Sequence, residues 1–185
     1  VTPFGAFTAG RQYTPGYLAS ASFDVMKTES SLALGQLVAI PASFDIRVSN
    51  SLQYGLKLNG LTATAMYAAG EIAGRANAGR LLGFMAMYQG NGYSFGGGYN
   101  TRNNELGEKS LTSAILGATV DVGPGTLTGQ FTTIKDDNPT GMSGISAAPP
   151  GNPATAPVAG LVQNAFIPGF RPAARLFQVG YRTTS

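Results

Sequence analysis

The residues of this chain that could act on other molecules are charged side chains standing singly in otherwise uncharged segments. Arg11 ends the apolar stretch FGAFTAG, and Arg47 follows the stretch FDI. The segment 14–44 between them holds two acids, Asp24 and Glu29, with Lys27 between the two. Fixed charges of opposite sign act on ions and dipolar solutes through their electric field, without making or breaking bonds. Any chemistry that these residues offer therefore acts through charge and not through covalent bonds.

The composition excludes most catalytic and metal sites. The chain contains no histidine and no cysteine, so it has no His-based triad, histidine general base or thiolate metal site. The LGEKS stretch at 106–110 lacks the upstream glycine spacing of a phosphate-binding loop. The net charge of +3 is scattered, without the Lys/Arg cluster of a nucleic-acid-binding face. We expect no enzyme activity, no cofactor, no metal ion and no nucleic-acid partner.

The low content of charge also limits the class of protein. Charged residues make up 11% of the chain, against about 25% in ordinary soluble domains. The longest apolar run, LLGFMAMY at 81–88, is far shorter than the roughly 18–20 residues of a membrane helix. The chain therefore fits neither a charged soluble domain nor a helical membrane protein.

Alternation of polar and apolar residues dominates the chain from Asp45 onward, which is typical of strands with one wet and one apolar face. In segments 45–58, 93–102 and 175–184 the wet parity includes Arg47, Ser49, Ser51, Gln53, Arg102 and Arg182. Two segments alternate less cleanly. In 80–89 both parities are apolar, and in 111–122 Ile115 falls on the wet side with Thr119 and Asp121.

Short turns and long connections succeed each other along the chain. Asn59-Gly60 and Asn91-Gly92 are type I′ hairpin signals, and GPG at 123–125 marks a third tight turn. We predict strands at about 4–12, 45–58, 61–70, 80–89, 93–102, 111–122, 126–135 and 175–184. Long strands with short turns at one end and long loops at the other are typical of an outer-membrane β-barrel.

Aromatic residues support the membrane interpretation. Tyr54, Tyr88 and Tyr93 fall near the short-turn ends, where an interfacial girdle would place them. The alternative is a soluble barrel or sandwich, but its outer face would carry too little charge to make a good water surface.

The stretches FGAFTAGRQYTPGY, FDIRVSNSLQYGLKLNGLTATAMYAAGE and LTSAILGATVDVGPGTLTGQFTTIKDDN resemble the general-diffusion porins of the Gram-negative outer membrane, most of all those of β-proteobacteria. The resemblance implies an all-β fold, an antiparallel transmembrane β-barrel of the sixteen-stranded porin type. About eight strands are present here, so residues 1–185 are expected to be a central, partial region of one barrel. Segment 14–44 is then the pore-constricting loop, and segment 136–174 a long extracellular loop.

The resemblance also implies a function and roles for individual residues. The protein would be a passive diffusion channel for ions and small hydrophilic solutes, surrounded by outer-membrane lipid and homotrimeric when full length. Arg11 and Arg47 would stand on the wall at the constriction, with Asp24 and Glu29 opposite. Lys27, Ser49, Ser51, Gln53, Arg102 and Arg182 would line the pore, the last two near its loop-side rim. This charge distribution predicts a weak preference for anions.

The side on which Arg11 lies depends on the strand register. Strict alternation groups it with Phe7 and Ala9 on the lipid side, where an arginine costs about 2–4 kcal/mol at mid-membrane. Either the strand ends at Gly10, or a β-bulge there turns Arg11 into the pore, and we favour the bulge.

Other functions fit part of the same sequence pattern. A structural or adhesive barrel without a conducting pore has the same strand pattern. A soluble ligand-binding barrel is a further alternative, and an outer-membrane hydrolase is disfavoured by the lack of histidine.

Overall fold

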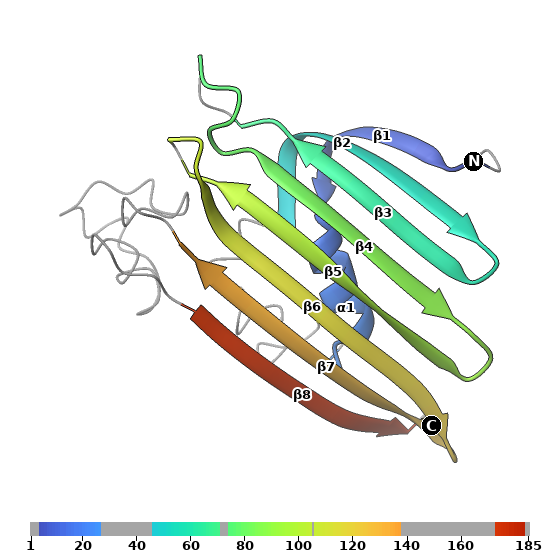
Figure 1. Ribbon diagram of the computed structural model, residues 1–185. Coiled ribbons are helices and arrows are strands. Elements are labelled where there is room, and N and C mark those ends of the chain that lie inside the picture. The colour runs from blue at the N-terminus through green and yellow to red at the C-terminus, as the bar shows by residue number, and fades with distance from the viewer. Residues whose placement is uncertain (1–3, 27–45, 71–73, 105, 138–172, 184–185) are drawn as a thin grey trace.

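The computed structural model describes residues 4–26, 46–70, 74–104, 106–137 and 173–183. All eight predicted strands are present and form one antiparallel sheet in chain order (Figure 1). The strands are β1 (Ala6–Tyr13), β2 (Arg47–Leu58), β3 (Leu61–Ala68), β4 (Leu81–Gln89), β5 (Tyr93–Asn103), β6 (Lys109–Val122), β7 (Gly125–Asp136) and β8 (Ala173–Thr183). Between β1 and β2, the described residues include helix α1 (Pro15–Phe23). The all-β fold class is confirmed.

Three tight turns lie at one end of the strands, as predicted. Asn59 and Gly60 have φ values of 46° and 84°, as a type I′ turn requires. Gly123 has a φ of 58° and Pro124 follows it, so the third turn is of the Gly-first, II′ kind. The type I′ prediction for Asn91-Gly92 is wrong, because only Gly92 has a positive φ, at 78°.

The longer connections lie at the opposite end of the strands. Segments 69–80 and 104–108 join β3 to β4 and β5 to β6. The predicted loop 136–174 is shortened at each end, since β7 reaches Asp136 and β8 begins at Ala173, and 138–172 lies outside the described residues. Of the predicted loop 14–44, the described part consists mainly of α1.

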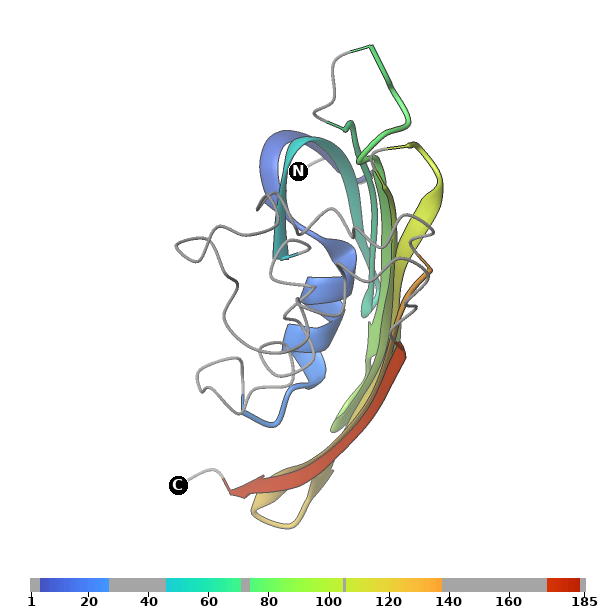
Figure 2. The ribbon, with the colours of Figure 1, turned by 90° about the vertical axis from the view of Figure 1, so that its left-hand side faces the viewer.

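The sheet is curved, and α1 lies against its concave face (Figure 2). The opposite, convex face is apolar and exposed. Phe177 and Leu116, for example, are 78% and 63% exposed. Tyr88 and Tyr93 have ring centroids 6.2 Å apart on this face near a tight turn, whereas Tyr54 packs on Phe7 of β1 at 4.8 Å. Among the described residues, no helix is long and apolar enough to span a membrane.

The apolar residues of the concave face explain the two segments whose alternation is unclear. Met85 of β4 and Ile115 of β6 form a buried cluster with Ala19 of α1. A second cluster joins Val48, Met66, Ala68 and Leu81. Under α1 the polar parity therefore becomes apolar, as Met85 and Ile115 show. A third apolar cluster on the same parity joins Leu111, Ile134 and Leu176.

Candidate functional site

Helix α1 begins at a strong local signal. Thr14 is its N-cap, with extended backbone, and its Oγ1 accepts a hydrogen bond from the Tyr17 N–H at 3.3 Å. Pro15 occupies the first turn, where no intrahelical N–H is needed. Five residues at helical spacing face the sheet and are buried: Pro15, Gly16, Ala19, Ser20 and Phe23.

Glycines of neighbouring strands make the surface on which α1 packs. A Cβ on Gly98 of β5 would lie 2.7 Å from the Ala19 Cβ. A Cβ on Gly117 of β6 would lie 2.5 Å from the Phe23 Cβ. Real Cβ atoms do not approach so closely, so only glycine allows the helix this near to the strand backbones. The helix is thus fitted to the sheet by shape.

Three amide side chains hold the helix from its first turn to its end. Asn100 of β5 accepts from the Gly16 N–H at 3.0 Å and donates to Thr14 Oγ1 at 3.1 Å. Gln130 of β7 donates to Ser20 Oγ at 3.0 Å. Gln178 of β8 accepts from the Val25 N–H at 3.3 Å. Each such bond contributes about 0.5–1.5 kcal/mol, and together they fix both ends and the middle of α1.

Asp24 is the C-cap residue of α1, and neighbouring groups donate hydrogen bonds to its carboxylate. The side chain is 4% exposed. Its Oδ1 accepts from Gln178 Nε2 at 3.1 Å and from the Met26 N–H at 3.0 Å. Asp24 therefore ends the helix as well as carrying a charge. Glu29 and Lys27, predicted beside it, lie outside the described residues.

The predicted faces of Arg47 and Ser49 are corrected by a bulge in β2. Gly10 pairs with Ser51 and Gln12 with Val48, so Arg11 alone stands opposite two residues, Ser49 and Asn50. Asn50 has a φ of 51°. The bulge places Val48 on the concave face, in the cluster with Met66. Its neighbours Arg47 and Ser49 therefore have the convex parity and not the predicted wet one.

Arg47 is nevertheless held close to α1. Its guanidinium lies 4.0 Å from the centre of the Tyr13 ring and donates to the Tyr13 hydroxyl. Tyr13 in turn stacks on Tyr17 of the helix at 5.1 Å. Arg47 thus stands at the N-terminal end of α1, while Asp24 stands at its C-terminal end, about 13 Å away along the helix axis. The structure does not bring these two charges face to face.

Arg11 keeps the parity that strict alternation gives it. Thr8 donates to Gln12 Oε1 at 2.5 Å, and Gln12 Nε2 lies 3.4 Å from Ser51 Oγ, so these side chains share the concave face. The favoured bulge at Gly10 is therefore wrong, because the extra residue lies in β2. Arg11 stands two residues before the end of β1, where the chain leaves the sheet for α1.

The other predicted pore-lining residues divide between the two ends of the strands. Ser51 and Gln53 lie on the concave face, and Ser51 donates to the Gly10 carbonyl at 2.6 Å. Arg102 pairs with Leu81 at the long-connection end. Arg182 pairs with Thr126 beside the turn at 123–124, so its predicted place near the loop-side rim is wrong.

A recess on the concave face lies between the end of α1 and the tight-turn ends of β5–β8. We call it the turn-side recess; its volume is about 470 Å³. It is lined by Ala21, Ser22, Asp24, Val25, Ser94, Thr119, Asp121, Thr126, Thr128, Gly180 and Arg182. Alternation places Asp121 and Thr119 on the wet side, but it does not reveal that the end of α1 encloses them. Sequence reasoning therefore missed this recess as a site.

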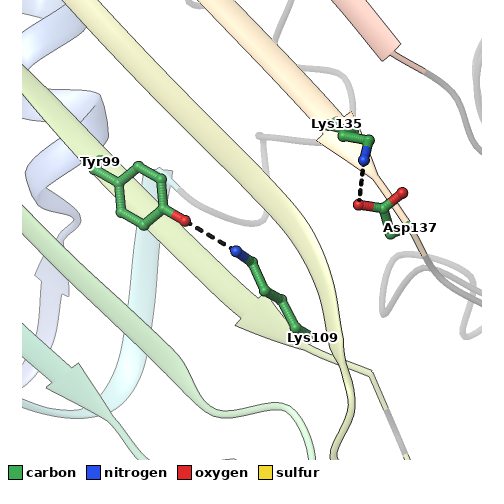
Figure 3. Close-up of polar contacts among 4 residues, drawn as sticks. All are labelled: Tyr99, Lys109, Lys135 and Asp137. Carbon is green, nitrogen blue, oxygen red and sulfur yellow. Dashed lines mark hydrogen bonds and ion pairs between the residues drawn. The ribbon is translucent and has the colours of Figure 1, made fainter.

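Charges on the convex parity are confined to the long-connection ends of the strands in the described part of the chain. Lys109 donates to the Tyr99 hydroxyl at 3.1 Å, and Lys135 forms an ion pair with Asp137 at 2.8 Å (Figure 3). Arg175, near the start of β8, is exposed at the same end. An uncharged apolar band thus separates these residues from the tight turns.

Two comparisons relate this chain to known proteins. A family model described as Gram-negative porin matches residues 1–182. A porin structure refined at 1.8 Å resolution matches with a TM-score of 0.51 and 12% sequence identity. The match covers 100% of this chain and 58% of that one, so the chain spans just over half the length of the solved structure. No curated protein sequence matches.

Proposed function

Because this chain belongs to the Gram-negative porin family, we propose that it forms the wall and the constriction of a channel for passive diffusion of ions and small hydrophilic solutes. A porin of this family lies in the outer membrane, with transmembrane β-strands. The convex apolar band then meets lipid, and the concave face meets water. From the family we further propose that the full-length protein is a homotrimer, which chemical cross-linking in detergent tests directly.

The observation that carries the channel proposal is the position of α1. A nine-residue helix is fixed on the polar face of a curved sheet by glycine contacts and three amide side chains. A segment so placed narrows the space on the concave side of the sheet and leaves the rest of that space open. We propose that α1 and the rest of segment 14–44 form the constriction.

We also propose a weak preference for anions. Cations of the concave parity include Arg102 at the long-connection end and Lys57 and Arg182 at the turn end. Arg47 has the convex parity, but Tyr13 holds it beside the helix start. The acids of the described concave surface are Asp24, which is buried and hydrogen-bonded, and Asp121. A net positive lining attracts anions and is screened by salt.

Planar-bilayer recordings of the full-length protein test both parts of the proposal. Steady open steps are expected, and their absence would favour a non-conducting structural barrel. In a salt gradient, Arg47→Gln should move the reversal potential toward cation preference. Arg11→Gln should move it less. Both arginines have the convex parity at a strand end, but Arg47 is held on Tyr13 beside the start of α1. An unchanged reversal potential in the double variant would contradict the roles given to these arginines.

A further inference from the structure

The turn-side recess contains charges of both signs on adjacent strands. Thr126 of β7 pairs with Asp121 of β6 on one side and with Arg182 of β8 on the other. Neighbouring strands lie about 4.8 Å apart, so the backbones that carry the two charges are about 10 Å apart. The three residues form a row across the sheet, with the acid at one end and the cation at the other.

Both charged groups are available to a ligand. Asp121 and Arg182 are exposed. Asp121 Oδ1 accepts a hydrogen bond from Thr126 Oγ1 at 2.9 Å, which orients the carboxylate and leaves its second oxygen for another donor. Within the described part of the chain, Arg182 makes no ion pair with Asp121 or Asp24. The two charges are thus held apart and do not neutralise each other.

The surface between and around the charges is polar and narrow. Hydroxyl groups line it, including the mutually bonded Ser94 and Thr119, whose oxygens lie 2.7 Å apart. The end of α1 closes one side, where Val25 packs so near Gly180 that a Cβ there would lie 3.2 Å from the Val25 Cβ. Asp24 is held by Gln178 at this wall, so its carboxylate is already bonded within the protein.

We propose that the turn-side recess is a binding station for small zwitterionic solutes, with their ammonium group at Asp121 and their carboxylate at Arg182. The guanidinium offers a planar pair of donors that matches a carboxylate, and the free oxygen of Asp121 accepts from an ammonium. Solutes with only one charge would engage only one end of the row. This inference rests on the proposed function, since it describes a step in the passage of a solute past α1.

Block of the single-channel current tests the inference. γ-Aminobutyrate is the probe, and butyrate and butylammonium are controls of the same chain length with one charge each. The zwitterion is expected to reduce the mean current of the full-length protein at a lower concentration than either control. Asp121→Asn and Arg182→Gln should each raise its half-blocking concentration by about tenfold, as expected for loss of one charge-assisted hydrogen bond.

Lys57→Gln provides the matched control for charge. Lys57 lies on the concave parity near the Asn59-Gly60 turn, at the same end of the sheet but outside the recess. Its substitution should leave block by γ-aminobutyrate unchanged. If Lys57→Gln weakens block as much as Arg182→Gln, or if the single-charge controls block equally well, the inference is wrong while the channel function stands.

Saturation-transfer NMR in detergent separates the two claims further, because it detects binding without conduction. Transfer to γ-aminobutyrate should be strong for the unmodified protein and weak for both recess variants. A protein that binds the probe but shows no open steps would overturn the channel function and not the site. Transfer that is equal in all variants would overturn the site.

Discussion

The concave face is built differently under α1 and beyond it, although the same strands supply both regions. Under the helix, β5 and β6 present Gly98, Ile115 and Gly117. A few residues further toward the tight turns, on the same parity, they present Ser94 and Asp121. The side of a strand is set by alternation, but the residue types on that side are set by what covers them. The covered region is fitted to a helix, and the uncovered region is polar.

The two regions also differ in the chemical groups that they present. The covered region uses contact at glycine and buried amides such as Asn100, which is 2% exposed. The uncovered region uses exposed hydroxyls and single charges such as Arg182. We therefore expect substitutions in the covered region to move α1, and substitutions in the uncovered region to change only how solutes interact.

The largest effect on the position of α1 is expected from Gly117→Ala. The added methyl group would lie 2.5 Å from the Phe23 Cβ, so the helix must shift, and overpacking of this kind costs about 1–3 kcal/mol. The open-channel conductance should change, and α1 should become sensitive to limited proteolysis. Gly129→Ala is the matched control, because a Cβ at Gly129 meets no atom within 4 Å. Equal behaviour of the two variants would contradict a close fit between helix and sheet.

A more local effect, confined to the start of the helix, is expected from Asn100→Ala. This change leaves the buried Gly16 N–H without its acceptor, a loss of about 1–3 kcal/mol at the start of the helix. Hydrogen exchange in α1 should accelerate while exchange in β5 stays slow. Ser94→Ala, on the same face of the same strand but beyond the helix, should leave exchange in α1 as it was. Acceleration by both variants would mean that the two regions are not separate.

The smallest effect, a small shift of the reversal potential, is expected from Asp24→Asn. The carboxylate is buried and accepts hydrogen bonds from Gln178 and the Met26 backbone, which oppose its field in the recess. Its substitution should therefore shift the reversal potential less than Asp121→Asn does. A larger shift for Asp24→Asn would show that the helix end, and not the wall of the recess, dominates the field.

The sequence predicts the sheet well, because alternation and turn chemistry are local. Every predicted strand is present, and the Asn59-Gly60 turn has the expected backbone. The wet-side position of Ile115 is also confirmed, since it packs under Ala19. The cluster of Ala19, Met85 and Ile115 further shows that the apolar Met85 on the wet face of 80–89 comes from burial under α1, which no pattern within the strand reveals.

Features that depend on contacts far apart in the chain were not predicted. The helix over Pro15–Phe23 has small and mixed residues without a clear apolar stripe, and its position depends on glycines more than sixty residues away in β4–β6. The bulge at Asn50 changes the parity of Arg47, yet asparagine merely tolerates the left-handed conformation that the bulge needs. The roles of Arg11 and Arg47 in selectivity stay predictions.

The most direct test of the account is whether α1 stays fixed on the concave face of the sheet. The chain has no cysteine, so the pair Val25→Cys and Gly180→Cys can be introduced without side reactions within it. The two Cβ atoms would lie 3.2 Å apart, slightly less than the spacing of about 3.5–4.5 Å in disulfides, so a small outward shift suffices to form the bond. We expect this bond to form readily and the conductance to be the same before and after reduction. Failure to form it, or a conductance that rises on reduction, would contradict a helix held permanently on the concave face.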